Sequence, residues 1–574
     1  MRGSNALWLH VALLLGVLWL AGIGTRSVWT PDEPREFALS VNMLGQDQHA
    51  VPTLAGRPFA EKPPLTYWAA AGAMRLFGRS AVVARLPNLL YGLITVLSTA
   101  WLAAAMLPPA QRRGGALVAA VVAGTAWLSF LHTIWLATDA PLLAGSAIAL
   151  LGAWLGPTAS SERGRNAGYL LFHLGLAAAF LAKNLLGLIA PLLAFGLFVL
   201  WDRRWRELLR WQLWAGLVVS GGLIGLWLLA VSWQPDGQNL LRIFLWDNSV
   251  GRFLPVATTG AYSSGHRNSP GKLISEVALG LLPWLFAALA AWAFVLRNAL
   301  GRNALSSATR YLAVAALPLI VLLSFSSTVR DVYALPAMVP LTAGVALWWQ
   351  QRVTAGRERG AVPLITRITL LAVGALGVVL GLAVAWVGDG MVFDGATPVL
   401  LVLAACAVVG LAARRLGTAQ SLLRGVGVFA GGLCVFLLLA SPVIERGQDL
   451  RPVASAAAHA AGDRPLLLTA RDETMAAALD YSSARRGGLT TDFAAALVAQ
   501  PQSLALVEVG SDRLTPAMRQ RLSALAPWLR NVAPATTEAA AQALLMAGWS
   551  VFLDLPNPGG RHYQLLTPPL PAAR

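Results

Sequence analysis

A succession of long apolar stretches constrains the fold of this chain more than any other feature. A bilayer crossing needs about 20 mostly apolar residues in one helix. The first stretch, 6–25, is not followed by a small-residue cleavage site, so we expect an anchor and not a removable signal peptide. The sequence therefore predicts a polytopic α-helical membrane protein. Its thirteen predicted spans are residues 6–25, 81–107, 115–135, 138–156, 166–183, 185–201, 211–232, 273–296, 311–326, 333–350, 367–388, 396–413 and 425–443.

Charged residues are scarce, which excludes two other classes of protein. They make up 12% of the 574 residues, whereas 56% of the residues are hydrophobic. A soluble globular protein has about 25% charged residues, and a disordered chain needs low hydrophobicity. The net charge of +17 would also fit a nucleic-acid binder. Such proteins are not built from bilayer-spanning stretches, so we expect no nucleic acid as a partner.

The positions of the positive charges predict the orientation of the spans. Basic residues accumulate in short loops on the cytoplasmic side of a membrane. With the N-terminus inside, the cytoplasmic segments hold nineteen basic and four acidic residues, and the opposite segments are nearly balanced. An odd number of spans then leaves the C-terminal tail outside. The charge excess is thus an orientation signal.

The chain divides into a membrane domain, 1–444, and a tail, 445–574, of different composition. The membrane domain has two large external loops, 26–80 and 233–272. Short apolar runs alternate with Ala-rich helical stretches in the tail, which is typical of a small α/β domain with an accessory or packing role. The predicted strands are Leu466–Thr469, Leu504–Val507 and Val551–Leu553, and the predicted helices are Glu473–Ala478, Pro516–Leu525 and Glu538–Ala547.

Two adjacent carboxylates, Asp32 and Glu33, follow the first span directly and are the leading catalytic candidates. A carboxylate at this point lies at the membrane interface, where a lipid-linked substrate presents its phosphate. The alternative is a capped amphipathic helix on the membrane surface. In that case Thr30 is the N-cap, Pro31 is the first helical residue, and the acids only complement the helix N-terminus.

The same loop contains Glu61-Lys62-Pro63-Pro64. The two prolines disfavour a helix, so Lys62 is either rigidly presented to a lipid phosphate or part of a membrane-entry turn. The chain has only three lysines, Lys62, Lys183 and Lys272, and the predicted topology places all three at the external face. Arginine serves the positive-inside positions, so these lysines suggest a site that needs a compact cation.

Further polar candidates follow on the external side. Asp139 is an acid in an otherwise apolar stretch, which indicates either function or an N-cap of the fourth span. Arg252 and Arg267 in the second loop can bind phosphate. In a later connection, Arg330 and Asp331 can pair with each other, and Tyr333 can bind an anion or anchor at the interface.

A metal site is not predicted by any ligand spacing in the sequence. The residues that would suit a divalent ion are Glu61, Asp247 and His266, and their spacing predicts no coordination geometry. We therefore expect no cofactor, with a divalent metal at these three residues as the alternative.

Taken in order, the polar segments resemble one family. Asp-Glu after the first span, Glu-Lys-Pro-Pro in the same loop, Thr-Asp at the fourth span, Asp-Asn-x-x-x-Arg-Phe in the second loop and Tyr-x-Leu-Pro at the tenth span are similar to the ArnT-like aminoarabinose transferases. These are inner-membrane glycosyltransferases of the GT-C class, related to protein mannosyltransferases. The resemblance covers roughly residues 1–345.

The resemblance implies a reaction on the periplasmic side of a bacterial inner membrane. A sugar, 4-amino-4-deoxy-L-arabinose or a related one, passes from undecaprenyl phosphate to a lipid A phosphate, a lipopolysaccharide modification connected with antibiotic resistance. It also implies Asp32 at the reacting centre, Asp139 as a second acid, and Lys62, Arg252 and Tyr333 around the lipid phosphate. Glu33 joins the catalytic candidates, and Glu61, Lys183 and Arg267 join the substrate-binding candidates.

Two other functions remain open from the sequence. A protein O-glycosyltransferase would differ only in its acceptor. A transporter of lipid-linked sugars would place charges and broken helices at mid-span, whereas the predicted spans carry charges only near their ends.

Overall fold

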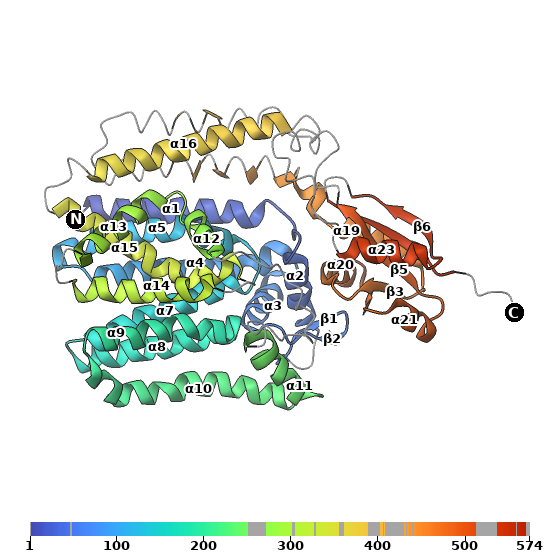
Figure 1. Cartoon of the computed structure of the whole chain (residues 1–574), viewed down its shortest axis with the longest axis horizontal. Coiled ribbons are helices and arrows are strands. Elements are labelled where there is room, and N and C mark those ends of the chain that lie inside the picture. Colours follow the sequence, from blue (N-terminus) through green and yellow to red (C-terminus); the bar gives the residue numbers. More distant parts are fainter. Residues whose placement is uncertain are drawn as a thin grey trace.

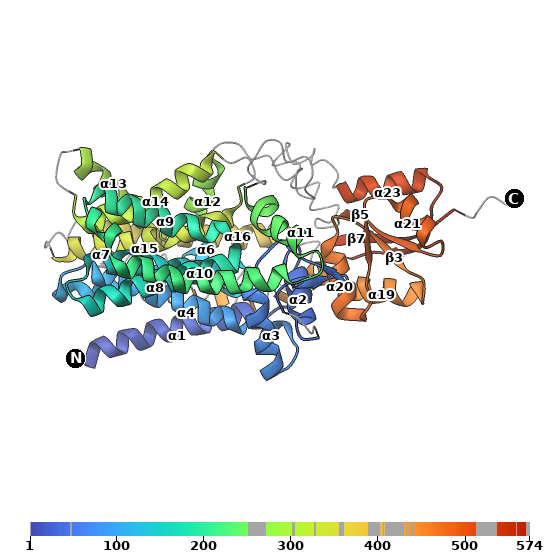
Figure 2. The same cartoon turned by 90° about the horizontal axis from the view of Figure 1, so that it is seen from below.

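The computed structural model contains an elongated bundle of helices with a smaller α/β unit at one end (Figure 1). The N-terminus lies at the opposite end of the bundle from that unit (Figures 1 and 2). The structure describes residues 2–45, 49–250, 271–300, 305–325, 329–354, 361–387, parts of 402–443, and then 444–511, 536–557 and 560–569.

Most predicted spans coincide with helices of the bundle. The span predictions up to 367–388 all fall on helices, whereas 396–413 and 425–443 lie for the most part outside the described residues. The bundle helices are α1 (Arg2–Gly24), α4 (Ala81–Ala105), α5 (Arg112–Thr125), α6 (Trp127–Ile134), α7 (Asp139–Thr158), α8 (Glu162–Lys183), α9 (Leu185–Trp201), α10 (Trp211–Ser232), α12 (Lys272–Gly280), α13 (Leu285–Leu300), α14 (Ser307–Ser324), α15 (Leu335–Thr354) and α16 (Ala361–Val387).

By length and composition, six of the described helices can cross a membrane, or eight if each of two bent helix pairs is one span. The chain is therefore a multi-pass membrane protein, and the count of thirteen spans stays a prediction. α9 is apolar but shorter than the six. α7 and α15 are almost entirely buried within the bundle, whereas much of α1 and α10 is exposed. That exposed surface is apolar, as expected where lipid surrounds a helix.

Two predicted spans, 115–135 and 273–296, are each broken into two helices, so the expectation of continuous spans there was wrong. The axes bend by 62° between α5 and α6 and by 117° between α12 and α13. Pro283 explains the second break, because proline cannot continue a helical hydrogen-bond ladder. The two breaks face each other: the backbone N–H of Trp127 donates to the Leu282 carbonyl at 2.8 Å, and the Trp284 indole donates to Thr125 Oγ1 at 2.9 Å. Each break thus provides hydrogen-bond partners for polar groups at the other break, which lipid could not hydrogen-bond.

The first of the two loops predicted to be external, and the described start of the second, fold against the end of the bundle that faces the α/β unit (Figures 1 and 2). The first loop forms two helices and a two-stranded hairpin, and the second begins with a short helix and a π-helical segment. These elements are α2 (Glu33–Asn42), β1 (Thr53–Leu54), β2 (Arg57–Pro58), α3 (Leu65–Phe77), α11 (Gly237–Arg242) and η3 (Ile243–Val250). Ala55 and Gly56 connect β1 and β2 with positive φ angles of 51° and 77°, as a tight hairpin turn requires.

The tail forms a five-stranded mixed sheet with the order β4-β3-β5-β7-β6. The first three strands are parallel, and β7 is antiparallel to both β5 and β6. Helices cover both faces (Figure 2): α19 and α20 pack on one side, and α21 and α23 on the other. The elements are α19 (Arg451–Ala461), β3 (Leu466–Thr469), α20 (Glu473–Ser483), β4 (Gly488–Thr490), α21 (Phe493–Ala499), β5 (Leu504–Ser511), α23 (Thr536–Met546), β6 (Ser550–Leu555) and β7 (Arg561–Thr567).

The predicted α/β character of the tail is confirmed by these elements. The three predicted strands lie in β3, β5 and β6, and two of the predicted helices lie in α20 and α23. The third, Pro516–Leu525, lies outside the described residues. Sequence reasoning missed β7, Arg561–Thr567, because its polar residues interrupt the apolar run, although Tyr563, Leu565 and Leu566 are fully buried.

Candidate active site

Asp32 occupies the N-cap position of α2, and its side chain makes no capping hydrogen bond. Thr30, the predicted N-cap, lies outside the helix and bonds to Gln448 instead; the expected Thr30 cap was therefore wrong. The Asp32 carboxylate accepts from Arg35 at Oδ1 (3.1 Å) and from Arg330 at Oδ2 (3.2 Å). An N-cap aspartate usually bonds to the helix backbone, so here the carboxylate is committed to two guanidinium groups.

The charges around Asp32 keep it ionised. Burial by itself raises the pKa of the carboxyl group, but the nearby charges of Arg35, Lys62 and Arg330 outweigh this effect and lower the pKa to about 2. About a quarter of the side chain, 23%, is exposed. Asp32 is thus a permanent anion that a substrate can reach.

Glu33 has a different environment from its neighbour. Its fully buried carboxylate forms ion pairs with Arg26 and with Arg85, whose Nη2 lies 2.8 Å from Oε2. It also accepts from the backbone N–H groups of Trp29 (3.0 Å) and Leu136 (2.8 Å). Burial raises the pKa of Glu33, but the two arginines outweigh it and lower the pKa. Both carboxylate oxygens of Glu33 are occupied by these partners, and the ion pair with Arg85 fixes the start of α2 against α4. This geometry argues against the predicted catalytic role of Glu33.

Glu36, one helical turn after Asp32, is a second buried anion that sequence reasoning missed. Its carboxylate accepts from Lys62 Nζ at 2.6 Å, from the Tyr67 hydroxyl at 2.8 Å and from Arg35 at 3.1 Å. Burial raises the pKa of Glu36, whereas Lys62 and Arg35 together lower it below its usual value. Its spacing of four residues from Asp32 places both on one helix face, which is the signal that could have found it. Glu36 thus holds Lys62 close to Asp32.

The second group of charges gathers around Asp139, the first residue of α7. Asp139 pairs with Lys183 at the last turn of α8, and Oδ2 lies 3.5 Å from Nδ1 of His132 in α6. The Lys183 ammonium lies 5.7 Å from the centre of the Tyr333 ring, within cation–π range. The structure therefore brings the predicted residues Asp139, Lys183 and Tyr333 together, and it adds His132, which the sequence did not single out.

Arg330 connects the two groups. It bonds to Asp32 and not, as one alternative held, only to its neighbour Asp331. Burial lowers the pKa of Arg330, but the charges of Asp32, Asp139 and Asp331 outweigh it and raise the pKa. Asp139 therefore lies within electrostatic range of the cation that binds Asp32, and the two predicted acids belong to one site.

The remaining predicted residues have different positions. Asn248 in η3 donates to the Ala60 carbonyl at 3.3 Å, so the second loop meets the first beside Glu61. Lys272, the third lysine, lies 3.8 Å from Glu276 on its own helix, α12. Arg252, His266 and Arg267 lie outside the described residues.

The suggested metal ligands are not brought together in the part of the chain that the structure describes. Within it, no group of three or more His, Cys, Asp or Glu residues is arranged to hold a metal ion. Asp247 lies 3.8 Å from Arg242, and His266 falls among the residues that are not described.

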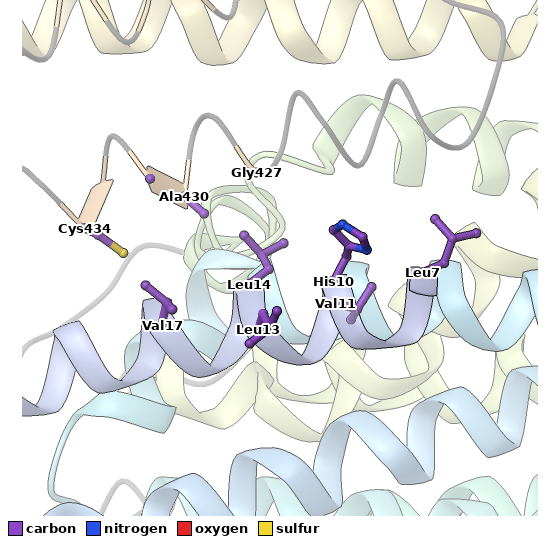
Figure 3. A pocket seen from close by; sticks show the side chains of 10 residues that line it. Leu7, His10, Val11, Leu13, Leu14, Val17, Gly427, Ala430 and Cys434 are labelled. Atoms are coloured by element: carbon purple, nitrogen blue, oxygen red, sulfur yellow. The ribbon is translucent and has the colours of Figure 1, made fainter. Parts of the chain in front are cut away.

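An apolar cavity of about 560 Å³ lies elsewhere, along the length of α1 (Figure 3). Side chains of α1 such as Leu14 and Val17 face Ala430 and Cys434 across it. The described residues that line this cavity include no carboxylate. The site proposed from chemistry is therefore the charged cluster at the end of the bundle, and not this apolar cavity.

Comparison with known proteins identifies the fold. A crystal structure of ArnT from Cupriavidus metallidurans bound to undecaprenyl phosphate matches with a TM-score of 0.67 and 19% identity, covering 98% of both chains. The chain has the fold of ArnT. The polytopic GT-C fold expected from the sequence is confirmed. The archaeal oligosaccharyltransferase AglB from Archaeoglobus fulgidus also matches, with a TM-score of 0.50 and 11% identity over 87% of this chain and 69% of that one.

Sequence comparison finds relatives that carry the name of this transferase. The undecaprenyl phosphate-alpha-4-amino-4-deoxy-L-arabinose arabinosyl transferase of Edwardsiella ictaluri is 29% identical over 372 residues, 64% of each chain. The protein of that name from Pseudomonas aeruginosa is 28% identical over 384 residues, 64% of this chain and 65% of its own length. The similarity thus spans less than two thirds of these relatives. Residues 61–233 match the family model described as dolichyl-phosphate-mannose-protein mannosyltransferase.

Proposed function

We propose that this protein is an inner-membrane glycosyltransferase that moves 4-amino-4-deoxy-L-arabinose, or a related sugar, from undecaprenyl phosphate to a phosphate of lipid A. The observation that carries the proposal is the charged cluster in a fold shared with an ArnT that binds undecaprenyl phosphate. Asp32 lies in it between Arg35 and Arg330, close to Lys62. The site faces the periplasm, with the N-terminus in the cytoplasm, as the positive-inside distribution supports.

The cations suit the leaving group of this reaction. When the sugar departs, the polyprenyl phosphate gains negative charge, and positive groups held nearby stabilise it. Lys62, Lys183 and Arg330 provide that charge, together with Arg252 and Arg267 from the second loop and the Tyr333 hydroxyl. Glu36 and Asp139 hold the ammonium groups of Lys62 and Lys183 in position. A donor phosphate then binds to groups that are already ordered.

The ionisation of Asp32 favours a phosphate acceptor. A hydroxyl acceptor needs a general base, and the best base has a pKa near the working pH. Asp32, with a pKa of about 2, is a weak base. A phosphate acceptor is already nucleophilic, so Asp32 can instead bind the sugar ammonium and stabilise positive charge that develops at the reacting carbon. Asp139 supplies the second acid of the cavity.

The decisive experiment is transfer in proteoliposomes. Purified protein is given undecaprenyl phosphate-linked aminoarabinose and lipid A, and the products are identified by mass spectrometry. We expect lipid A with one added sugar, and loss of at least about 100-fold in rate for Asp32→Asn. Asp554→Asn, the same change at an exposed carboxylate of the tail, should keep wild-type rate. Full turnover by Asp32→Asn would contradict its role.

Lys62 gives a separate test of phosphate binding. Lys62→Ala should weaken binding of undecaprenyl phosphate by about 10- to 150-fold, because a charge-assisted contact is worth about 1.5–3 kcal/mol. Lys272→Ala removes another external lysine, one paired within its own helix, and should leave affinity unchanged. Equal affinity of Lys62→Ala and wild type would remove Lys62 from the site.

A protein acceptor is the second candidate, because residues 61–233 match the mannosyltransferase model. The same assay decides between them when lipid A is replaced by dephosphorylated lipid A or by a Ser/Thr-rich polypeptide. Transfer to the polypeptide, and not to lipid A, would establish the second function.

A further inference from the structure

The described tail touches the candidate site at one charged side chain. Glu473, the first residue of α20, accepts a hydrogen bond from Arg35 Nη1 at 2.9 Å. The other end of the same guanidinium, Nη2, donates to Asp32 Oδ1 and Glu36 Oε1, both at 3.1 Å. Glu473 is 18% exposed and Arg35 only 13%, so solvent screens this ion pair only weakly. A single arginine thus links the tail to the carboxylate of the site.

The placement of Glu473 is fixed on both sides. Asp472 caps α20 by accepting from the Met475 N–H at 3.1 Å. The Thr474 hydroxyl donates to the carbonyl of Pro31, directly before Asp32, at 2.9 Å. Further along the two helices, the Tyr481 ring meets Phe37 edge-on at 5.3 Å. α20 therefore lies along α2 and presents Glu473 to the turn that carries Asp32.

We infer that Glu473 is a positioning residue of the active site: it holds Arg35 so that Asp32 and Lys62 keep the geometry that sugar transfer needs. This inference rests on the proposed function. Without Glu473, Arg35 keeps two described carboxylates within ion-pair distance, Asp32 and Glu36. The Arg35 guanidinium can then move towards Asp32 and cover the carboxylate oxygens that would bind the sugar. The tail thereby completes the site and does more than pack against it.

The first test separates kcat from KM for the donor. Glu473→Gln should lower kcat by about 10- to 100-fold with KM changed less than about threefold, the range seen when a supporting residue misplaces a reactive group. Glu473→Asp keeps the charge and should recover part of the loss. The matched control is Asp480→Asn, because Asp480 accepts from Asn42 at 2.7 Å across the same pair of helices, and Asn42 lies outside the charged cluster. It should keep wild-type kcat.

A double-mutant cycle tests whether Glu473 acts through Arg35. If it does, Glu473→Gln combined with Arg35→Gln should lose no more than Arg35→Gln alone. Multiplicative losses, or a wild-type kcat for Glu473→Gln, would overturn the inference.

A second experiment does not require sugar transfer. Hydrogen–deuterium exchange of the full-length protein should show faster exchange in residues 33–37 for Glu473→Gln than for Asp480→Asn. Equal exchange in the two variants would overturn the positioning role even if no donor is turned over. If the wild type transfers no sugar but the exchange difference is present, the proposed function fails while the Glu473–Arg35 coupling stands.

Discussion

Asp32 and Glu33 are adjacent in the sequence, yet their carboxylates have opposite environments. Successive residues of a helix point about 100° apart, so Glu33 turns into the bundle towards Arg26 and Arg85 while Asp32 faces the external cluster. The sequence nominated both, because both follow the first span. Only the positions of arginines 7 and 52 residues away distinguish the buried, paired Glu33 from the partly exposed Asp32.

Glu33→Gln should destabilise the protein. It leaves two buried guanidinium groups short of their counter-charge, and breaking a buried ion pair costs about 3–5 kcal/mol. The melting temperature of the detergent-solubilised protein should fall by several degrees. Glu162→Gln, the same substitution at a 65% exposed carboxylate, serves as the control, and its melting temperature should stay close to wild type. A Glu33→Gln variant as stable as wild type would contradict the buried network.

Arg330→Gln should move the acid limit of transfer to higher pH. The depressed pKa of Asp32, about 2, means that its charge is lost only as the pH falls through that value. Removing the Arg330 charge brings the pKa back towards 3.8. When the pH is lowered from about 7 to about 3, the transfer rate should therefore begin to fall at a higher pH in Arg330→Gln than in the wild type. The control is Arg242→Gln, which changes an exposed arginine beside Asp247 and should leave the acid side of the pH–rate profile unchanged. An unchanged profile in Arg330→Gln as well would contradict the contact between Arg330 and Asp32.

At the scale of elements, the two broken spans are the main departure from the hydropathy pattern. Apolar residues run through both, so hydropathy alone predicts continuous helices. The breaks are stable because α5–α6 and α12–α13 exchange hydrogen bonds at the point where each ladder is interrupted. In a membrane, irregular backbone persists only where protein satisfies it. The bend before Trp127 also carries α6, and with it His132, to the side of Asp139.

Trp284→Phe tests the contact between the breaks. It removes the indole donor to Thr125, and the loss should destabilise the protein by about 0.5–1.5 kcal/mol beyond the change in volume. Trp292→Phe makes the same substitution in α13 at a buried indole that has no hydrogen-bond partner among the described residues. Thermal unfolding should show a larger decrease for Trp284→Phe, and equal decreases would argue against a role for the hydrogen bond.

At the scale of the whole molecule, the tail and the membrane bundle meet around α2. Glu445 accepts from the Trp29 indole at 2.6 Å and from the Ser27 N–H at 3.0 Å, and α20 contacts Pro31 and Phe37. Residues 27–42 therefore contact two segments that are more than 400 positions away in the sequence. The division into domains 1–444 and 445–574 describes the composition well, but the candidate site draws on both.

Tyr481→Ala should loosen the docking of the tail. The aromatic pair with Phe37 contributes about 0.5–1.5 kcal/mol beyond its buried area, so amide exchange should increase in both α2 and α20. Val498→Ala, at an 84% exposed side chain of α21, should change neither. Unchanged exchange in Tyr481→Ala would show that other contacts hold the two parts together.

The sequence by itself determined the class of this protein: hydropathy located the helices, the alternation of short apolar runs indicated the α/β tail, and local motifs nominated Asp32, Lys62, Asp139 and Tyr333. These properties depend on residues that are close in the sequence, so the helical and strand periodicity of the sequence indicates them. The tertiary structure alone showed that Glu33 pairs with two buried arginines, that Glu36 holds Lys62, and that Glu473 reaches Arg35. Each of these depends on charges brought together from distant parts of the chain, and the partner of a buried charge is set by packing and not by spacing.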